Sequence, residues 1–146
     1  MPGGTVTFLS TDVESPTQLL RRLADDYPRV LDEHRRLLRA SVAEWGGCEV
    51  EAAGDAFLVA FARASDAVAA AVDAQRRLAA HRWPAGAPVR VRMGLHTGQV
   101  TPIGDRYVGL ESRARLGWAT QPMVARWCSP RRRARWSRRH SRRTYA

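Results

Sequence analysis

The chain has no lysine, only two cysteines and no apolar run near the roughly 18–20 residues that a membrane span requires. Two cysteines, Cys48 and Cys128, are too few for a disulfide framework or a four-cysteine zinc site. The N-terminus lacks the basic and then apolar pattern of a secretion signal. These absences argue against a disulfide-rich secreted domain and a membrane protein. We therefore expect a reduced, cytoplasmic protein with no membrane partner.

Acidic residues are absent after Glu111. Up to that residue the chain has 13 arginines against 14 carboxylates, a net charge of −1, whereas residues 112–146 have 11 arginines and no carboxylate. The length of 146 residues leaves room for one domain. The charge distribution therefore predicts a globular domain over residues 1–111, followed by an Arg-rich tail of disordered or irregular structure over residues 112–146.

Hydrophobic periodicity predicts strands and helices in alternation. The first predicted strand is buried and ends in a polar loop at Asp12, and Pro28 breaks or kinks the first helical stretch. The predicted strands cover residues 4–11, 48–53, 56–61 and 89–95, the helices cover 17–42 and 64–80, and a further hairpin joins 98–102 to 107–108. The order β–α–β–β–α–β is typical of a ferredoxin-like α+β sandwich, in which helices cover one face of an antiparallel sheet.

Two carboxylates occupy informative positions in this order. Asp12 follows the first predicted strand, and Asp55 lies in the tight Gly54-Asp55 turn between the next two. If the first strand lies beside that hairpin, both carboxylates meet at one place on the sheet. Two carboxylates held close together repel each other unless a cation lies between them, so the pattern is compatible with a divalent-metal site. Aspartate is also common in turns because it caps backbone N–H groups.

Four blocks of the sequence, in order, resemble the catalytic domain of class III nucleotidyl cyclases of the bacterial adenylate/guanylate cyclase type. They are TFLSTDVESPTQLL, EAAGDAFLVAF, VRVRMGLHTGQV and GDRYVGLE, and together they cover about residues 4 to 111. The resemblance implies a ferredoxin-like fold that works as a homodimer. It also implies conversion of ATP or GTP to a cyclic 3′,5′-monophosphate and pyrophosphate by a two-metal mechanism.

The resemblance also assigns roles to particular residues. Two divalent cations, Mg or Mn, are expected on Asp12 and Asp55, with the backbone carbonyl of Val13 as a further ligand. The segment after Asp12 is expected to wrap the phosphates with backbone N–H groups at a helix start. The phosphate-binding residues implied in this way are Val13, Glu14, Ser15 and Thr17.

The chain departs from the family pattern at the base-reading positions. Glu51 stands where the family has a lysine, and Arg106 stands where it has aspartate or a small polar residue. The sequence therefore does not decide between ATP and GTP. Pro16 also replaces a residue whose N–H would face a phosphate.

After GLE the family continues with a helix that carries the transition-state Asn or His and Arg, and then with a pair of strands. Residues 112–146 contain neither, so no catalytic residue of that set is retained and the domain lacks its last helix and strands. Reading the codons one base out of frame converts Met123-Val124 to Gly and Trp127-Cys128 to Val, and free codon choice elsewhere restores the family segment. We therefore predict that the tail is out-of-frame translation after Glu111. This predicts a very poor or inactive cyclase.

Two other functions remain open at this stage. The domain can serve as a pseudocyclase or regulatory fragment that binds nucleotide and metal without turnover. Alternatively, the tail can bind nucleic acid non-specifically, because its arginines alternate with Trp127, Trp136 and His140.

Overall fold

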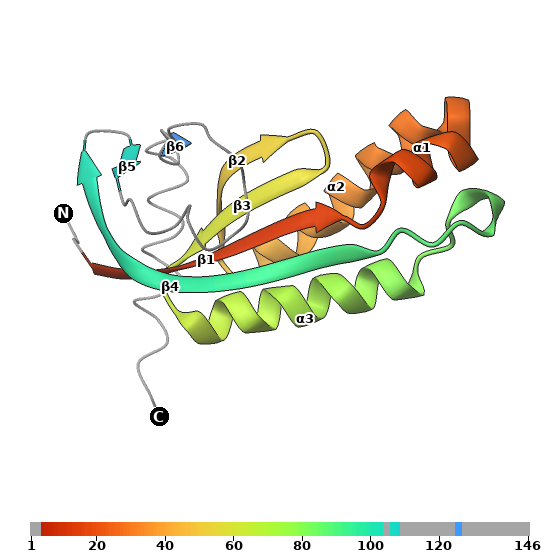
Figure 1. The fold of residues 1–146 in the computed structure, drawn as a ribbon. Helices are drawn as coiled ribbons and strands as arrows, with labels where there is room; N and C mark the ends of the chain where they lie inside the picture. Colours follow the sequence, from red (N-terminus) through yellow and green to blue (C-terminus); the bar gives the residue numbers. More distant parts are fainter. Residues whose placement is uncertain (1–3, 104–105, 109–124, 127–146) are drawn as a thin grey trace.

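The computed structural model describes residues 4–103, 106–108 and 125–126. Figure 1 shows a twisted sheet flanked by helices. The elements in chain order are β1 (Gly4–Val13), α1 (Pro16–Leu23), η1 (Ala24–Asp26), α2 (Tyr27–Glu44), β2 (Cys48–Ala53), β3 (Ala56–Phe61), α3 (Ala64–Ala80), η2 (Pro84–Gly86), β4 (Val91–Ile103), β5 (Arg106–Val108) and β6 (Ala125–Arg126).

The sheet has the order β2-β3-β1-β4-β5-β6, and every pairing is antiparallel. In the described residues the first four strands in chain order therefore have the arrangement of a ferredoxin-like fold, with β1 and β3 in the middle. The predicted fold class is confirmed. The first strand does lie beside the β2–β3 hairpin, because β1 pairs with β3 from Thr7 opposite Phe61 to Thr11 opposite Phe57.

The hairpin follows its sequence signal closely. β2 and β3 have the predicted bounds, and Gly54 adopts a φ of 59°, which the two-residue turn requires and a side chain would strain. The predicted helix over residues 64–80 is also confirmed as α3.

The first helical stretch is divided, but the division comes before Pro28. The α-helix stops at Leu23, a 3₁₀ turn covers Ala24–Asp26, and Pro28 lies in the first turn of α2. A proline is tolerated there because the first N–H groups of a helix have no intrahelical acceptor. The ring therefore begins a new helix and does not kink an existing one.

Two of the predicted strands have wrong bounds. β1 continues to Val13, so Asp12 lies inside the strand, opposite Arg92 of β4. β4 begins at Val91 and runs without interruption to Ile103, so the segment predicted as a separate strand after Gly98 is its second half. Pairing with β1 supplies the hydrogen bonds that carry the strand through Gly98. The predicted hairpin around residues 104–105 is confirmed by the pairing of Pro102 with Tyr107.

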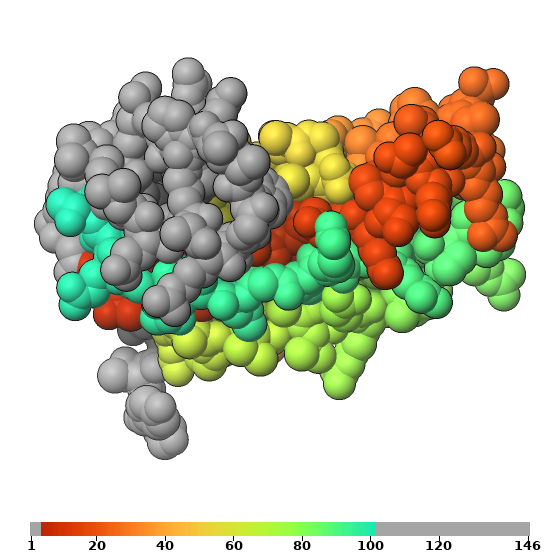
Figure 2. All heavy atoms as spheres, in the orientation of Figure 1, coloured from red at the N-terminus to blue at the C-terminus, as the bar shows by residue number. Residues whose placement is uncertain are grey.

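The core lies mainly between the sheet and the helices. α2 and α3 pack on the same face, where one cluster joins Val13, Leu38, Phe57 and Leu78. A second cluster on the opposite face includes Phe8, and its other members are Val6, Val50, Leu58, Ala60 and Val100. In Figure 2, α3 and β4 lie side by side across the lower part of the visible face.

Two findings bear on the remaining predictions. Residues 112–146 are predicted to be disordered or irregular, but β6 lies within them and pairs with β5. Ala125–Arg126 is therefore an exception to that prediction. The rest of residues 112–146, and with it the predicted loss of the last helix and strands, lies outside the described residues. Among the described helices, none is long and apolar enough to cross a membrane.

Candidate functional site

The structure brings the two predicted metal-binding aspartates to the same end of the sheet. Asp12 is the penultimate residue of β1, and Asp55 lies in the β2–β3 turn. The backbone N–H of Val13, the residue after Asp12, donates a hydrogen bond of 2.8 Å to Oδ2 of Asp55. This bond ties the turn to the end of β1. It also leaves one further carboxylate oxygen on Asp55.

Asp12 has a cationic partner within the protein. The Nε and Nη2 atoms of Arg92 donate to Oδ1 and Oδ2 of Asp12 at 2.7 and 3.1 Å, a two-pronged contact between paired strands. The side chain of Arg92 is 66% exposed and that of Asp12 is 28% exposed, so solvent reaches the pair. The Asp12 carboxylate raises the pKa of Arg92 through these hydrogen bonds and its charge, and the charges of Glu14 and Asp55 add to the effect. Three carboxylates therefore act on one guanidinium at this end of the sheet.

The segment predicted to wrap phosphates is only partly available. The N–H of Val13 is donated to Asp55, and the N–H of Glu14 is donated to the carbonyl of Arg90 at 2.8 Å. Pro16 has no N–H. Among the four predicted phosphate-binding residues, this leaves the N–H groups of Ser15 and Thr17, both exposed residues at the start of α1. Ser15 has a φ of 50°, an uncommon left-handed conformation for a residue other than glycine, where β1 turns into the helix.

The two base-reading positions lie on different strands. Glu51 is exposed on β2, next to a bulge between Glu49 and Glu51 in its pairing with β3. Arg106 is the first residue of β5, opposite Ile103 of β4. Their strands are separated in the sheet by β3, β1 and β4. The structure thus places the backbones of these two positions on opposite sides of β1.

The donor set suits a hard divalent cation. Carboxylate and carbonyl oxygens are the ligands preferred by Mg²⁺ and Mn²⁺. Within the part of the chain that the structure describes, no three Asp, Glu, His or Cys side chains form a ready-made metal cluster. Mg²⁺ commonly binds through one or two carboxylates and completes its shell with water and substrate phosphates. Asp12 and Asp55 match that kind of site.

Two arginines at this site were not singled out by the sequence. Arg92 lies opposite Asp12 because β4 pairs with β1, a pairing that no local pattern around Arg92 indicates. Arg35 of α2 donates from Nε and Nη2 to the carbonyl of Gly54, at 3.2 and 2.5 Å. No local sequence pattern distinguishes a helix arginine that reaches a distant turn from one that faces solvent.

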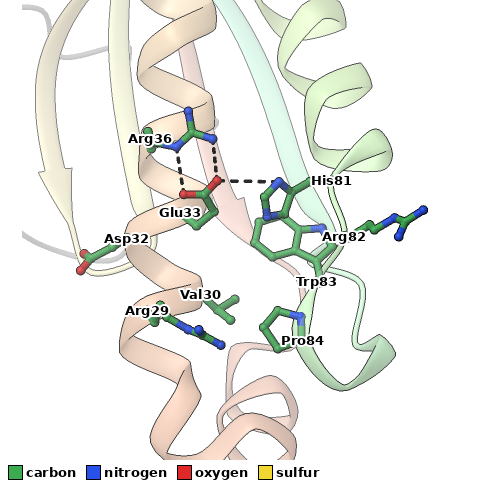
Figure 3. Close-up of a pocket in the computed structure, with 9 residues that line it drawn as sticks. All are labelled: Arg29, Val30, Asp32, Glu33, Arg36, His81, Arg82, Trp83 and Pro84. Atoms are coloured by element: carbon green, nitrogen blue, oxygen red, sulfur yellow. Dashed lines mark hydrogen bonds and ion pairs between the residues drawn. The ribbon is translucent and has the colours of Figure 1, made fainter.

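A hollow of about 710 Å³ lies elsewhere on the molecule, between α2 and the segment that follows α3 (Figure 3). Its wall includes Trp83 and a chain of ionic contacts in which Glu33 accepts from Arg36 and lies 3.7 Å from Nδ1 of His81. Neither predicted metal-binding aspartate lines it. Three arginines line it against two carboxylates, and one of these, Glu33, is paired with Arg36, so it offers no comparable cation environment.

Comparison with known proteins identifies the class that the fold and site define. Residues 2–113 match the adenylate and guanylate cyclase catalytic domain family. The chain belongs to this family.

Individual proteins and solved structures are similar to the chain over about three-quarters of its length. An uncharacterised protein of Mycobacterium tuberculosis is 38% identical over 110 residues, which cover 74% of this chain and 36% of that protein. A solved structure of an adenylate cyclase from Trypanosoma brucei in its monomeric state has a TM-score of 0.70 at 24% identity, over 75% of this chain and 65% of that one, and shows the fold. The guanylate cyclase domain of RhGC from Catenaria anguillulae, solved in complex with GTP, has a TM-score of 0.64 at 25% identity, over 74% and 68%. The chain therefore spans about a third of the length of the Mycobacterium tuberculosis protein.

Proposed function

We propose that this domain binds a purine nucleoside triphosphate together with divalent cations at the end of β1, in the manner of a nucleotidyl cyclase. The observation that supports this most directly is the hydrogen bond from the N–H of Val13 to Asp55, which places the second aspartate beside the strand end that carries the first. Family membership supplies the reaction class, cyclisation of ATP or GTP with release of pyrophosphate.

Each residue would then have a defined task. Asp12, Asp55 and the carbonyl of Val13 would hold two divalent cations, Mg or Mn, and these supply activation of the ribose 3′-hydroxyl and charge neutralisation at the α-phosphate. The N–H groups of Ser15 and Thr17 at the start of α1 would bind phosphate oxygens, where the helix dipole favours negative charge. Binding of a cation at Asp12 requires Arg92 to release that carboxylate, because both compete for the same oxygens.

We further propose that turnover is severely impaired in this chain and that residues 112–146 are out-of-frame translation. The family match ends at residue 113, two residues after Glu111, and all 11 arginines that follow stand without a carboxylate. Loss of each transition-state donor typically reduces the rate by about 10²–10³-fold. Resequencing the gene across codons 105–130 tests the second proposal. An uninterrupted nucleotide sequence with no cyclase segment in any other frame would disprove it.

Binding is the appropriate first test of the site because it does not depend on turnover. The full chain should bind Mn²⁺, measured as loss of the free Mn²⁺ electron paramagnetic resonance signal, and should bind it more tightly with ATP or GTP present. Asp12→Asn and Asp55→Asn should each weaken Mn²⁺ binding by about tenfold or more. Asp25→Asn, at an exposed carboxylate of η1, is the matched control and should leave binding unchanged. Equal loss in all three variants would show that binding is non-specific.

Three further measurements separate the remaining alternatives: comparison of the two nucleotides, detection of a cyclic product, and the mass in solution. ATP and GTP are compared directly, since Glu51 and Arg106 do not indicate which base is preferred. Nucleotide binding without a cyclic product would identify a pseudocyclase or regulatory fragment. A homodimer, as the family resemblance implies, would appear as a doubled mass in solution by light scattering.

The tail supports a second candidate function, non-specific binding of nucleic acid. Its 11 arginines and absence of carboxylates give it the charge to contact a phosphate backbone. Such binding should fall steeply as salt rises and should show no sequence preference. A clear preference for one sequence would instead indicate a specific nucleic-acid interface.

A further inference from the structure

We infer that Arg35 is a positioning residue for the metal site: through the Gly54 carbonyl, it holds the β2–β3 turn so that the Asp55 carboxylate meets the end of β1. The inference rests on the proposed metal-binding role of Asp55. The contact itself joins α2 to the turn, 19 residues further along the chain.

Apart from the pairing of Ala53 with Ala56 that closes the hairpin, the turn packs little against its surroundings. Gly54 is exposed and has no side chain, and a Cβ built on it would meet nothing within 4 Å. Ala53 before it is also exposed, and β2 is the outermost strand on this side of the sheet. The hairpin pairing sets the shape of the turn, and its polar contacts to α2 and β1 tie it to the rest of the domain.

Arg35 supplies two of these contacts to a single acceptor. Its Nε and Nη2 atoms lie 3.2 and 2.5 Å from the Gly54 carbonyl oxygen, while its Nη1 lies 3.4 Å from Oδ1 of Asp32 one helical turn earlier. The guanidinium is planar and always charged, so both donors keep a fixed geometry. At 29% exposure the side chain is largely covered, which limits its freedom to leave.

Holding that carbonyl also orients Asp55. The carbonyl of Gly54 and the nitrogen and Cα of Asp55 belong to one planar peptide unit, so fixing the oxygen fixes where the Asp55 side chain starts. From the other side, the carboxylate accepts the N–H of Val13 at 2.8 Å. The turn is thereby held at two points, one on α2 and one on β1. Supporting contacts of this type typically change metal affinity by about 10–100-fold when removed.

The same helix provides a matched control. Arg39 lies one turn beyond Arg35 and donates from Nε and Nη2 to the carboxylate of Glu49 at 2.9 and 3.1 Å. Its ion pair therefore links α2 to the same hairpin with similar chemistry near the start of β2, and its guanidinium also lies 5.4 Å from the ring centroid of Phe57 without contacting the Gly54 carbonyl. If Arg35 merely docks the hairpin, the two arginines should be equivalent.

The test uses two readouts on the full chain. Arg35→Met and Arg39→Met keep the aliphatic stem and remove the donors, and Arg35→Lys restores one charged donor. Hydrogen exchange of the Val13 amide reports whether Asp55 still accepts it, with no metal present. Mn²⁺ titration reports the affinity of the site, and thermal unfolding shows that each variant is folded.

We expect faster Val13 exchange and about tenfold weaker Mn²⁺ binding in Arg35→Met, near wild-type values in Arg39→Met, and partial recovery in Arg35→Lys. Unchanged Val13 exchange in Arg35→Met, or equal changes in both Met variants, would overturn the inference. If the wild type itself fails to bind Mn²⁺ while Val13 exchange still depends on Arg35, the proposed function fails and the positioning role of Arg35 stands.

Discussion

Burial of His34 should make the stability of this protein sensitive to mild acid. His34 lies on α2 with 0% of its surface exposed, and its ring meets Phe57 edge-on with centroids 6.1 Å apart. Burial lowers the pKa of His34 from 6.5 to about 4, and the negative charge of Asp55 opposes only part of that effect. The native state therefore holds the imidazole in its neutral form at a pH where the unfolded chain binds a proton.

The sign and size of the effect follow from this difference in pKa. Above pH 6.5 the ring is neutral in both states, so His34 adds no pH dependence there. Between pH 6.5 and about 4 the unfolded state binds more protons, so the free energy of unfolding falls as the pH falls. A shift from 6.5 to about 4 corresponds to a loss of about 3 kcal/mol, at about 1.4 kcal/mol for each pH unit.

The assay is urea unfolding of the wild type and of His34→Leu at intervals from pH 7.5 to 4. Carboxylates titrate near the lower end of this range in both proteins, so the difference between the two curves isolates the histidine. The variant should lose about 3 kcal/mol less than the wild type over the interval. Parallel curves would refute the reasoning, because they would mean that His34 is not held neutral by the fold.

Three further predictions concern packing and the ion pair. Gly47→Ala should cost about 1–3 kcal/mol in urea unfolding, because the new Cβ would lie 2.6 Å from Cζ of Phe61; wild-type stability would contradict this close approach. Leu38→Ala, at a side chain only 2% exposed, should cost about 2–5 kcal/mol in the same assay, and a smaller loss would mean that the core collapses around the gap. Arg92→Gln should tighten Mn²⁺ binding in the absence of nucleotide, because it removes the cation that now occupies Asp12, and weaker binding would show that Arg92 does not compete.

Local sequence signals were reliable wherever the structure is locally determined. The Gly54-Asp55 turn gave the bounds of β2 and β3 without error, since a two-residue turn fixes the ends of both strands. The helix at 64–80 follows in the same way from its own composition and periodicity.

Errors arose where pairing between distant segments overrode local signals. The sequence predicts a strand end at Asp12 and a break between residues 95 and 98, yet β1 and β4 pair from Gly4 opposite Val100 to Val13 opposite Val91. A long antiparallel partner satisfies the backbone donors and acceptors of both strands, so each continues past residues that favour a turn. The sequence of either segment alone contains no information about its partner's length.

The candidate site also has features that the sequence predicts and features that only the tertiary structure shows. Residue type, order and family pattern are properties of the sequence, and they were sufficient to select Asp12 and Asp55 and to indicate nucleotide chemistry. The contacts that organise the site join residues 80 positions apart for Arg92 with Asp12 and 42 apart for Val13 with Asp55. Such contacts exist only after β1 has paired with β3 and β4 and α2 has packed on the sheet, because hydrogen bonds and ion pairs act over a few ångströms. The sequence by itself therefore selected the candidate side chains of the site, and the tertiary structure decided that Asp12 pairs with Arg92 and that Asp55 accepts the N–H of Val13.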